Sequence, residues 1–590
     1  MTRHASNRSY PDSSRPLHAA VAKIIDQFTL PTADLKKITD HFLAELRRGL
    51  LDPGLPFQLP AFVTTIPTGE ECGKFLSVDL GGTNCRICLV HLQGNGEFSV
   101  TQSKHAVPQD VMVNEQFEPL FSWLAARIGD FVAEHIQSSS GGGITSTASE
   151  TRTPLGFTFS FTCDQTSLSD GTLIHWDKGW DIPAAIGRDP CRLLQNSIDA
   201  AGVQVEVVAL ANDSVGTLLA RAYTAASINN GTPSRTLASI IVGTGTNAAY
   251  IEQLSRIERY SQPPQIGSGK KDGLAVMVMN SEWGCWDDAL AVLPQTHFDA
   301  DIDTSSSNPG GQMFEKMASG MYLGELFRLA VHELVQSGDV FDFEAAGDST
   351  PLVQRDALDT SLLSALAQNN TSIIDSKELV SSRLAVDGVS DRDVYALKAI
   401  AGSITARAAR LTGAALAAIL IQCGYGVNTQ KIQDAAVVGE AMAIAACPEA
   451  TEAPLTDSKK KSWLITSTAK VFGAIASCAR DLLSCCFPVT AGDRRDSSQC
   501  AKRSRETSTS MSREAASIGG HLEDATEIID VGITGSVIEL HPTFETEMLE
   551  AIGEIPAIAL DNRRKLRTGL CRDGSAVGAA LMAHAALCQK

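Results

Sequence analysis

The chain has 590 residues, of which 44% are hydrophobic and 20% charged, so it is long enough to bury one large core or to form two or more domains. A formal net charge of −19 and a pI near 5.1 argue against nucleic acid or an anionic membrane as the general partner, because the overall field repels phosphate. An anionic ligand would have to be held by local backbone N–H groups, a few Lys or Arg side chains, or a divalent cation.

The 14 cysteines are scattered, and only Cys85 and Cys88 are spaced like metal ligands. On a strand these two side chains would point to opposite faces, which favours packing in the core. The sequence shows neither an N-terminal signal segment nor a run of about 18 uncharged apolar residues that could span a membrane. We therefore expect a protein of the reducing cytoplasm.

The first predicted element follows a polar segment, residues 1–18, that we expect to be disordered. Thr32 can cap a helix, whose apolar stripe recurs at helical spacing. The stripe is Leu35, Ile38, Phe42 and Leu46. Residues 137–153 and 261–273 are polar and are predicted to be surface loops that precede strands. Farther on, Phe314–Leu334 is predicted to be one helix, with Phe314, Met317 and Met321 on one stripe.

A third insert, at about residues 448–525, is larger and serine-rich, with a basic end. Three charged residues between Trp463 and Phe487 argue against a membrane-spanning helix there. We favour a solvated loop with one docked helix. The alternatives are a basic patch that recognises a protein partner, or lipid attachment at Cys485 and Cys486.

Two apolar runs, "FLSVD" and "CRICLV", flank a Gly-Gly pair. This spacing predicts a hairpin in which Gly81 and Gly82 allow φ > 0 and expose amides that can contact a phosphate. A strand follows the glycines, whereas a helix follows the phosphate loop of the Gly-Lys-Ser/Thr type. Asp79 could hold Mg²⁺ directly or through water, and Thr83 and Arg86 could donate to phosphoryl oxygens. The alternative is a plain hairpin with a glycine turn.

The segment "DLGGTNCR" resembles the phosphate-binding hairpin of the hexokinase family, sugar kinases with the two-lobe actin-like ATPase (ribonuclease H-like) fold. The resemblance recurs in order from about residue 55 to the C-terminus, leaving out the third insert. Its further segments are "QSKHAVP", "LGFTFSF", "WDKGW", "ALANDSVGT", "IIVGTGTNAAY", "NSEWG", "NPGGQMFEKMASGMYLGEL", "TGSVIELHP" and "DGSAVGAAL". It implies an α/β chain with an active-site cleft between two lobes. The small lobe would be residues 74–211 plus 574–590, and the large lobe 19–73 plus 212–573, interrupted by the third insert.

The resemblance also implies a reaction, the transfer of the γ-phosphoryl group of ATP, with Mg²⁺, to the 6-hydroxyl of glucose or a related hexose. Asp213 would be the general base, joined at the reacting centre by Lys178 and Arg86. A carboxylate suits a loose phosphoryl-transfer transition state, which needs orientation and modest proton acceptance. The sugar-binding residues implied are Ser160, Asp177, Lys178, Asn212, Asp213, Asn247, Glu282, Gln312 and Glu315. The ATP-binding residues implied are Asp79, Gly81, Gly82, Thr83, Asn84, Arg86, Gly243, Thr244, Gly245, Gly535 and Ser536.

Three positions depart from the family pattern: Asp177 stands where Thr is usual, Thr162 where Pro is common, and Thr534 where Asp is common. A carboxylate about 5 Å from Asp213 at an effective dielectric of about 20 would be repelled by about 3 kcal/mol. Such a repulsion could slow phosphoryl transfer about a hundredfold. Pairing of Asp177 with Lys178 or a protonation shift could offset it. The alternatives are therefore a kinase for N-acetylglucosamine, mannose or fructose, or a weakly active sugar sensor that signals through the third insert.

Overall fold

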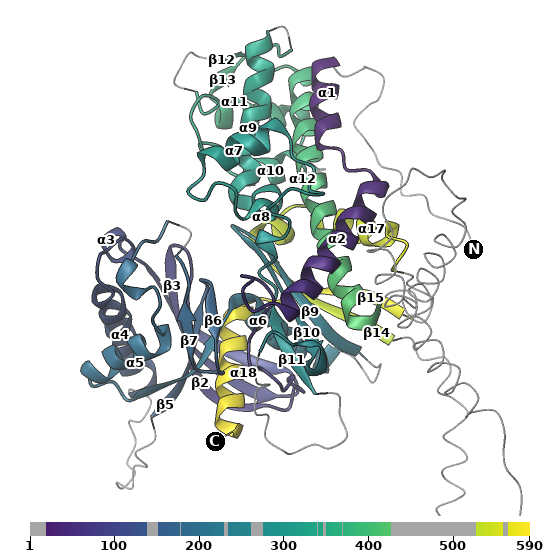
Figure 1. Ribbon diagram of the computed structural model, residues 1–590. Coiled ribbons are helices and arrows are strands. Elements are labelled where there is room, and N and C mark those ends of the chain that lie inside the picture. The colour runs from purple at the N-terminus through teal and green to yellow at the C-terminus, as the bar shows by residue number, and fades with distance from the viewer. Residues whose placement is uncertain are drawn as a thin grey trace, which may run out of the picture. The chain divides into compact units, whose positions relative to one another are not determined.

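The computed structural model describes ten stretches of the chain (Figure 1). They are residues 19–137, 152–176, 179–228, 234–260, 275–338, 340–345, 350–368, 370–425, 527–558 and 564–589. Asp177, Lys178, residues 1–18 and the third insert lie outside the described residues, as do most residues of the two predicted polar loops.

A five-stranded sheet has the strand order β4-β3-β2-β5-β8. Its strands are β2 (Cys72–Leu80), β3 (Asn84–Gly94), β4 (Glu97–Ala106), β5 (Thr153–Phe159) and β8 (Val205–Ala211). Strands β2, β3 and β4 form an antiparallel meander, whereas β2, β5 and β8 run parallel. Parallel strands are covered on both faces, which explains why β5 and β8 read as apolar runs.

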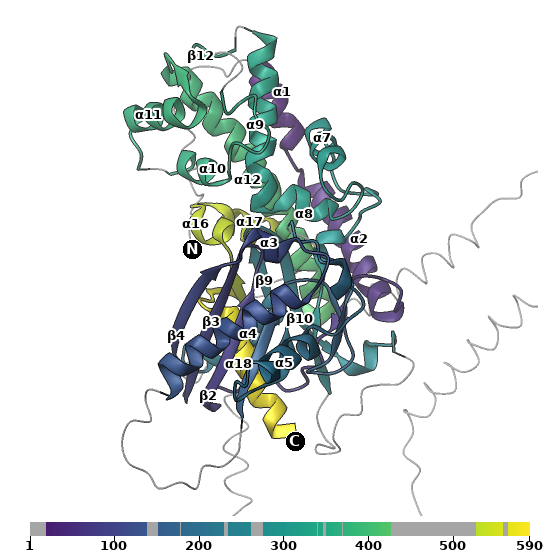
Figure 2. The same ribbon diagram turned by 90° about the vertical axis from the view of Figure 1, so that its left-hand side faces the viewer.

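Helices cover both faces of this sheet. Helices α4 (Glu118–Val132) and α5 (Pro190–Ala200) lie over one face, and α18 (Gly574–Gln589) lies over the other (Figure 2). Cys85 belongs to the core shared with α4 and α5, while Cys88 belongs to the core shared with α18. The prediction that these two thiols point to opposite faces is therefore confirmed.

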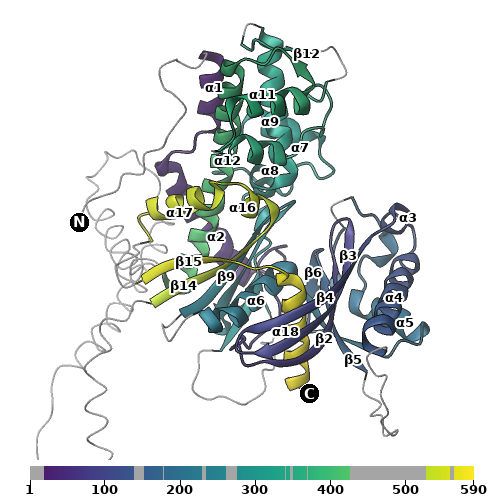
Figure 3. The same ribbon diagram turned by 180° about the vertical axis from the view of Figure 1, so that it is seen from behind.

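A six-stranded sheet has the order β1-β11-β10-β9-β14-β15. Its strands are β1 (Leu59–Pro60), β9 (Ser234–Val242), β10 (Thr246–Gln253), β11 (Val276–Asn280), β14 (Glu527–Thr534) and β15 (Arg564–Leu570). Neighbouring strands in the run β1-β11-β10-β9 are antiparallel. Strands β9, β14 and β15 run parallel to one another. Helix α6 (Asp213–Ile228) leads from the five-stranded sheet into this one, and α6 and α18 share one core with strands of both sheets (Figure 3).

The remaining helices pack against the six-stranded sheet and one another around the largest core. They are α1 (Ala19–Phe28), α2 (Thr32–Leu51), α7 (His297–Ser305), α8 (Met313–Ala318), α9 (Gly320–Ser337), α10 (Ser361–Leu366), α11 (Ile373–Leu384), α12 (Asp391–Leu420), α16 (Ser536–Leu540) and α17 (Phe544–Glu554). Short elements are α3 (Gln109–Met112), β6 (Cys163–Gln165), β7 (Gly171–Leu173), β12 (Glu344–Ala345) and β13 (Val386–Asp387).

One helix in the described part of the chain, Asp391–Tyr425, is long and apolar enough to cross a membrane by length and composition alone. The most apolar part of it is 89% buried inside the protein. Such burial is typical of a helix at the centre of a core, and α12 packs against α1, α2, α9 and α17.

The predicted apolar stripe of α2 is confirmed, since all four of its residues are buried. The predicted cap is wrong, because Pro31 occupies the N-cap position. The hydroxyl of Thr32 donates instead to Glu554 Oε2, 2.7 Å away, on α17.

The single helix predicted over Phe314–Leu334 is also wrong, because the chain breaks at Ser319 between α8 and α9. The Gly320 amide leaves the helical pattern and donates to the Gly243 carbonyl at 2.7 Å. Phe314 and Met317 are buried as predicted, but Met321 is 56% exposed. A contact with a distant turn therefore overrides the local helical pattern.

Candidate functional site

The predicted hairpin is confirmed by antiparallel pairing of β2 with β3 and by a bond from the Gly81 amide to the Asn84 carbonyl at 3.0 Å. Neither Gly81 nor Gly82 uses a positive φ, so the turn does not use the conformational freedom that the sequence pointed to. The Trp180 indole donates to the Gly82 carbonyl at 2.6 Å and stacks on Trp176 with ring centroids 5.5 Å apart. The Trp180 side chain thus holds the hairpin tip in place. Gly81 and Gly82 carry no side chain that could cover the backbone there.

Asp79 and Arg86 face each other across this hairpin. The Arg86 Nη2 donates to Asp79 Oδ2 at 2.6 Å, and Asp79 is only 6% exposed. Burial by itself would lower the pKa of Arg86, but the charge and hydrogen bond of Asp79 outweigh it and raise that pKa. The Arg86 guanidinium therefore stays protonated beside the hairpin tip.

Asn212 and Asp213 lie at the junction of β8 and α6. The Asn212 Oδ1 accepts from the Ser214 amide at 2.9 Å and from its hydroxyl at 2.6 Å, which caps the helix. The Asp213 Oδ1 also accepts from the Ser214 amide, at 2.8 Å. The half-buried Asp213 carboxylate is thus held at the positive end of a 16-residue helix.

A network of side-chain amides joins this junction to the six-stranded sheet. The Asn280 Oδ1 accepts from Asn247 Nδ2 at 2.9 Å and from Ser214 Oγ at 3.4 Å. The Asn280 Nδ2 donates to Glu282 Oε1 at 2.6 Å. Sequence reasoning missed Asn280 and Ser214, although both lie within quoted segments, because their role depends on cross-strand neighbours. Asn280 therefore connects Asn247 and Glu282, two predicted site residues, with Ser214, the neighbour of Asp213.

Two further polar residues, Glu315 and Gln312, each lie against a glycine. A Cβ at Gly245 would lie 2.7 Å from Glu315 Oε2, and a Cβ at Gly284 would lie 2.3 Å from Gln312 Oε1. The Glu315 Oε2 also accepts from the Thr246 amide at 2.9 Å. Glu282 and Gln312 both adopt left-handed backbone conformations, with φ of 46° and 58°. Strained residues of this kind persist only when their surroundings hold them in place.

We name these residues the sugar-side cluster, because the sequence predicted that role for most of them. Its members are Asn212, Asp213, Asn247, Asn280, Glu282, Gln312 and Glu315. Ser160, also predicted to bind sugar, is buried after β5, and its amide donates to the Leu80 carbonyl at 3.3 Å beside the hairpin. The predicted sugar ligands Asp177 and Lys178 lie outside the described residues.

Two glycine turns predicted to bind ATP come together. A Cβ at Gly535, whose φ is 115°, would lie 2.5 Å from the Val242 carbonyl, so only glycine fits there. The Gly243 amide donates to the Gly245 carbonyl at 2.9 Å, and the Met321 amide donates to the Thr244 carbonyl at 3.0 Å. Ser536 begins α16, directly after Gly535. The two turns therefore lie side by side, with glycine backbone groups that no side chain of their own covers.

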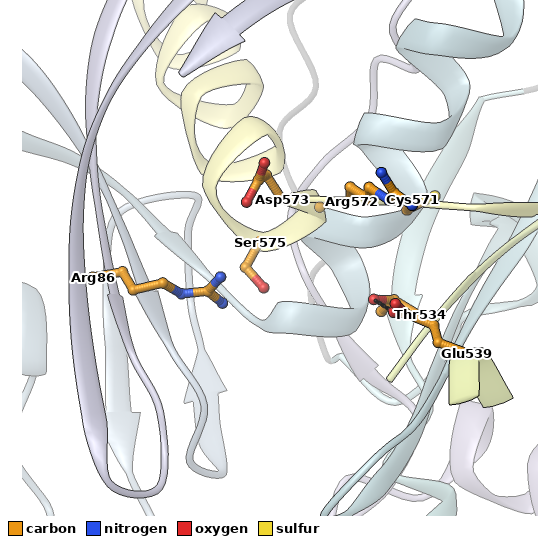
Figure 4. Close-up of a pocket in the computed structure, with 8 residues that line it drawn as sticks. Arg86, Thr534, Glu539, Cys571, Arg572, Asp573 and Ser575 are labelled. Atoms are coloured by element: carbon orange, nitrogen blue, oxygen red, sulfur yellow. Dashed lines mark hydrogen bonds between the residues drawn. The ribbon is translucent and has the colours of Figure 1, made fainter. Parts of the chain in front are cut away.

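Next to these turns lies a pocket of about 350 Å³, which we name the nucleotide pocket. It is lined by Arg86, Thr534, Glu539, Cys571, Arg572, Asp573, Gly574 and Ser575. Figure 4 shows the Arg86 side chain extending from β3 toward Ser575, with Thr534 and Glu539 across the pocket. The Glu539 Oε1 accepts from the Gly535 amide at 2.9 Å and from the Thr534 hydroxyl at 3.0 Å.

Sequence reasoning missed the part of this lining contributed by Glu539, Arg572, Asp573 and Ser575. The segment "DGSAVGAAL" was singled out, but nothing in it told which side chain faces a ligand. Glu539 lies in the quoted segment "TGSVIELHP", but nothing in that segment told that its side chain faces the pocket. Among the described residues, no group of three or more His, Cys, Asp or Glu side chains could hold a metal by itself.

Comparisons with known proteins identify the family. A family model described as Hexokinase matches residues 20–223, and a second of the same description matches residues 237–447 and 503–585. Glucokinase of Aspergillus niger is 32% identical over 577 residues, which cover 95% of this chain and 96% of that protein. Hexokinase-1 of Saccharomyces cerevisiae is 35% identical over 425 residues, 71% of this chain and 82% of its own length.

Among solved structures, a hexokinase from Schistosoma mansoni complexed with glucose superposes with a TM-score of 0.65 at 24% identity. The match covers 96% of this chain and 98% of that one. The fold is therefore the two-lobe actin-like ATPase fold, as the sequence predicted. The chain belongs to the hexokinase family of sugar kinases, which are phosphotransferases.

Proposed function

We propose that this chain transfers the γ-phosphoryl group of ATP to the 6-hydroxyl of glucose or a related hexose. The observation that carries the proposal is the sugar-side cluster, in which Asn247, Asn280 and Glu282 are hydrogen-bonded to one another. The Ser214 hydroxyl links them to the junction that bears Asn212 and Asp213. A hexose presents a ring of hydroxyls, and each buried hydroxyl needs a donor or an acceptor. Such a concentration of polar groups suits a sugar better than an apolar ligand.

Asp213 is proposed as the general base that accepts the proton of the 6-hydroxyl as it attacks the γ-phosphorus. The carboxylate is oriented by the Ser214 amide, 2.8 Å away, and by its place at the first residue of α6. In a loose transition state, positioning the attacking oxygen matters more than the strength of the base. Lys178, in a quoted segment, is proposed to lie near the transferred group.

ATP is proposed to bind at the nucleotide pocket with its phosphates toward the hairpin. The uncovered backbone of the glycine turns and the Arg86 guanidinium supply donors for phosphate oxygens. Thr83, Asn84, Thr244 and Ser536 are proposed to add contacts from the same turns.

Mg²⁺ is proposed to accompany ATP, and the residues present fit it. Mg²⁺ is usually held by one or two carboxylates together with substrate phosphates and water, and Asp79 supplies a carboxylate beside the hairpin tip. Asp79 would hold the ion directly or through water. When bound, the ion neutralises charge on the phosphates.

A coupled assay with a panel of hexoses and N-acetylglucosamine tests this proposal. We expect ATP-dependent product with glucose or a close relative. Absence of turnover with every sugar at micromolar enzyme would contradict the proposal.

A weakly active sugar sensor is the competing function, motivated by Asp177 in a position where the family usually has threonine. The variant Asp177→Thr separates the two. A large gain in rate would favour the sensor, whereas an unchanged rate would show that the site tolerates the acid. Deletion of residues 448–525 tests signalling through the third insert, because unchanged activity and location would leave the insert without a role.

We further propose cytoplasmic location, a place in glycolysis, and a lobe division at residues 74–211 plus 574–590 against 19–73 plus 212–573. The division is supported by the two sheets, because every strand of the five-stranded sheet lies between Cys72 and Ala211 and every strand of the six-stranded sheet lies outside that range. The acidic net charge supports small-molecule partners and argues against nucleic acid.

A further inference from the structure

A buried ionic cluster lies between α6 and the six-stranded sheet. Asp530, on β14, is fully buried and accepts from Arg221 Nε at 2.6 Å and from Arg221 Nη2 at 2.7 Å. It also accepts from Arg567 Nε at 2.5 Å and from Thr236 Oγ1 at 3.2 Å. One carboxylate thus joins a helix to three strands, with the bidentate geometry that makes arginine pairs directional.

The sheet is shaped to receive the Arg221 side chain. A Cβ at Gly569 would lie 2.2 Å from Arg221 Cζ, and a Cβ at Gly532 would lie 3.0 Å from Arg221 Cβ. Gly532 and Gly569 follow Asp530 and Arg567 by two residues, so each lies on the same sheet face as the charged residue before it. Glycine inside a strand often marks a close approach, here by a guanidinium lying on the backbone.

Three of the elements that meet at Asp530, namely α6, β14 and β15, each have one end near the proposed reacting centre. Arg221 is eight residues beyond Asp213 on α6, about 12 Å along the helix axis. Asp530 is four residues before Thr534, about 13 Å along a strand. Arg567 on β15 is likewise four residues before Cys571, where the pocket-lining segment 571–575 begins.

The start of α6 has a second anchor of a different kind. A Cβ at Gly578 would lie 2.1 Å from Gly216 Cα, so α6 and α18 touch backbone to backbone without a side chain between them. A contact of this kind sets the distance between two backbones but carries no directional bond. The Arg221–Asp530 pair, more than one turn farther along, adds a directional bond between α6 and β14.

We propose that Arg221, Asp530 and Arg567 are positioning residues that hold the helix bearing Asp213 in fixed register with the nucleotide turn and pocket. The proposal rests on the proposed function, because it takes Asp213 as the base and Thr534–Ser536 as a nucleotide contact. Loss of the cluster lets α6 shift relative to β14, while the hydrogen bonds among Asn247, Asn280 and Glu282, none of which lies on α6, are kept.

The test is Arg221→Met, which keeps side-chain length but removes the charge and the bidentate pair. We expect kcat/KM for ATP to fall about ten- to a hundredfold, since small misplacement of reacting groups has effects of that order. The Kd for glucose, followed by tryptophan fluorescence, should stay within about twofold of the wild type. Arg221→Lys, which restores a charge without the fork, should recover only part of the loss.

The matched control is Arg407→Met. Arg407 makes a bidentate pair with Asp299, both bonds 2.7 Å, and the two side chains are as buried as Arg221 and Asp530. This pair joins α12 to α7 and touches no site residue. We expect it to lower Tm and to leave both kinetic constants of the folded enzyme unchanged.

Arg221→Met could also fail to fold, because it leaves Asp530 buried with one guanidinium fewer. The double variant Arg221→Met with Asp530→Asn removes both charges and should fold better while keeping the kinetic loss. Calorimetric titration of a non-hydrolysable ATP analogue, with glucose present, needs no turnover and therefore separates this proposal from failure of the proposed reaction. Equal affinities for that analogue in the wild type and the double variant would overturn the proposal, as would a parallel loss of glucose affinity.

Discussion

The sugar-side cluster and the nucleotide pocket are built on different principles. In the cluster, carboxylates and amides bond to one another, and two left-handed residues and two close glycine contacts hold them in place. In the pocket, the turns supply backbone, and Glu539 and Arg572 are exposed. The difference indicates that the sugar half is organised before binding, whereas the nucleotide half has adaptable side chains.

The largest effect on activity is expected from a change at Asp213, where the sugar half and the nucleotide half meet. Asp213→Asn keeps the bond to the Ser214 amide but cannot accept a proton. We expect kcat to fall about a thousandfold, within the usual contribution of a general base, while glucose Kd changes little. Coupled kinetics and fluorescence titration measure the two constants, and a kcat within tenfold of the wild type would remove Asp213 from its proposed role.

A methyl group at Gly284 tests whether the sugar half is rigid. Its Cβ would lie 2.3 Å from Gln312 Oε1, so Gly284→Ala must displace that side chain. We expect KM for glucose to rise about thirtyfold and KM for ATP to stay within about twofold. Gly402→Ala is the matched control, because its Cβ in the middle of α12 would meet nothing within 4 Å, and it should leave both constants unchanged. Equal effects of the two variants would contradict a preorganised sugar site.

Asp288 supports the sugar half, because its Oδ1 accepts at 2.9 Å from the amide of Met313, the residue after Gln312. Burial raises the pKa of this carboxyl from 3.8 to about 6. The folded protein therefore holds the proton more tightly than the unfolded chain. The stability that this provides is complete below pH 3.8, is lost as pH rises toward 6, and is absent at pH 7.

Asp288→Asn keeps the acceptor and removes the titration. We expect a gain of about 1 kcal/mol in the free energy of unfolding at pH 7, reduced from the full shift because the side chain is partly exposed. The gain should disappear toward pH 4. Denaturant unfolding at both pH values measures it, and an equal gain at both would show that the carboxyl does not titrate as described.

The smallest effect on a kinetic constant is expected from a substitution in the nucleotide half. Glu539→Ala removes an exposed carboxylate that accepts from the Gly535 amide, but the φ of 115° at Gly535 is also fixed by its packing against Val242. We expect KM for ATP to rise about threefold with glucose constants unchanged. A rise comparable to that of Gly284→Ala for glucose would erase the proposed difference between the halves.

Local patterns were enough to predict much of the fold. The hairpin of β2 and β3, the opposite faces of Cys85 and Cys88, and the buried stripe of α2 all follow from periodicities of two or 3.6 residues. The junction at Asn212 and Asp213 lies where the apolar run of the quoted segment "ALANDSVGT" gives way to polar residues. These features depend on neighbours in sequence.

The errors and omissions arise from contacts between distant residues. The helix break at Ser319 is set by the Gly243 carbonyl, and Thr32 bonds to α17 instead of capping its own helix. Gly81 and Gly82 permit a positive φ but do not require one. Asn280 and Glu539 gain their roles from strands and turns far away in sequence. No periodicity in a single sequence encodes such partners.

The most direct measurement of the central claim is a crystal structure of this chain with glucose and a non-hydrolysable ATP analogue bound. We predict that the 6-hydroxyl lies within hydrogen-bonding distance of the Asp213 carboxylate, on the path to the γ-phosphate held beside Asp79 and Arg86. A sugar bound away from Asn247, Asn280 and Glu282, or an Asp213 carboxylate turned away from both ligands, would contradict the account.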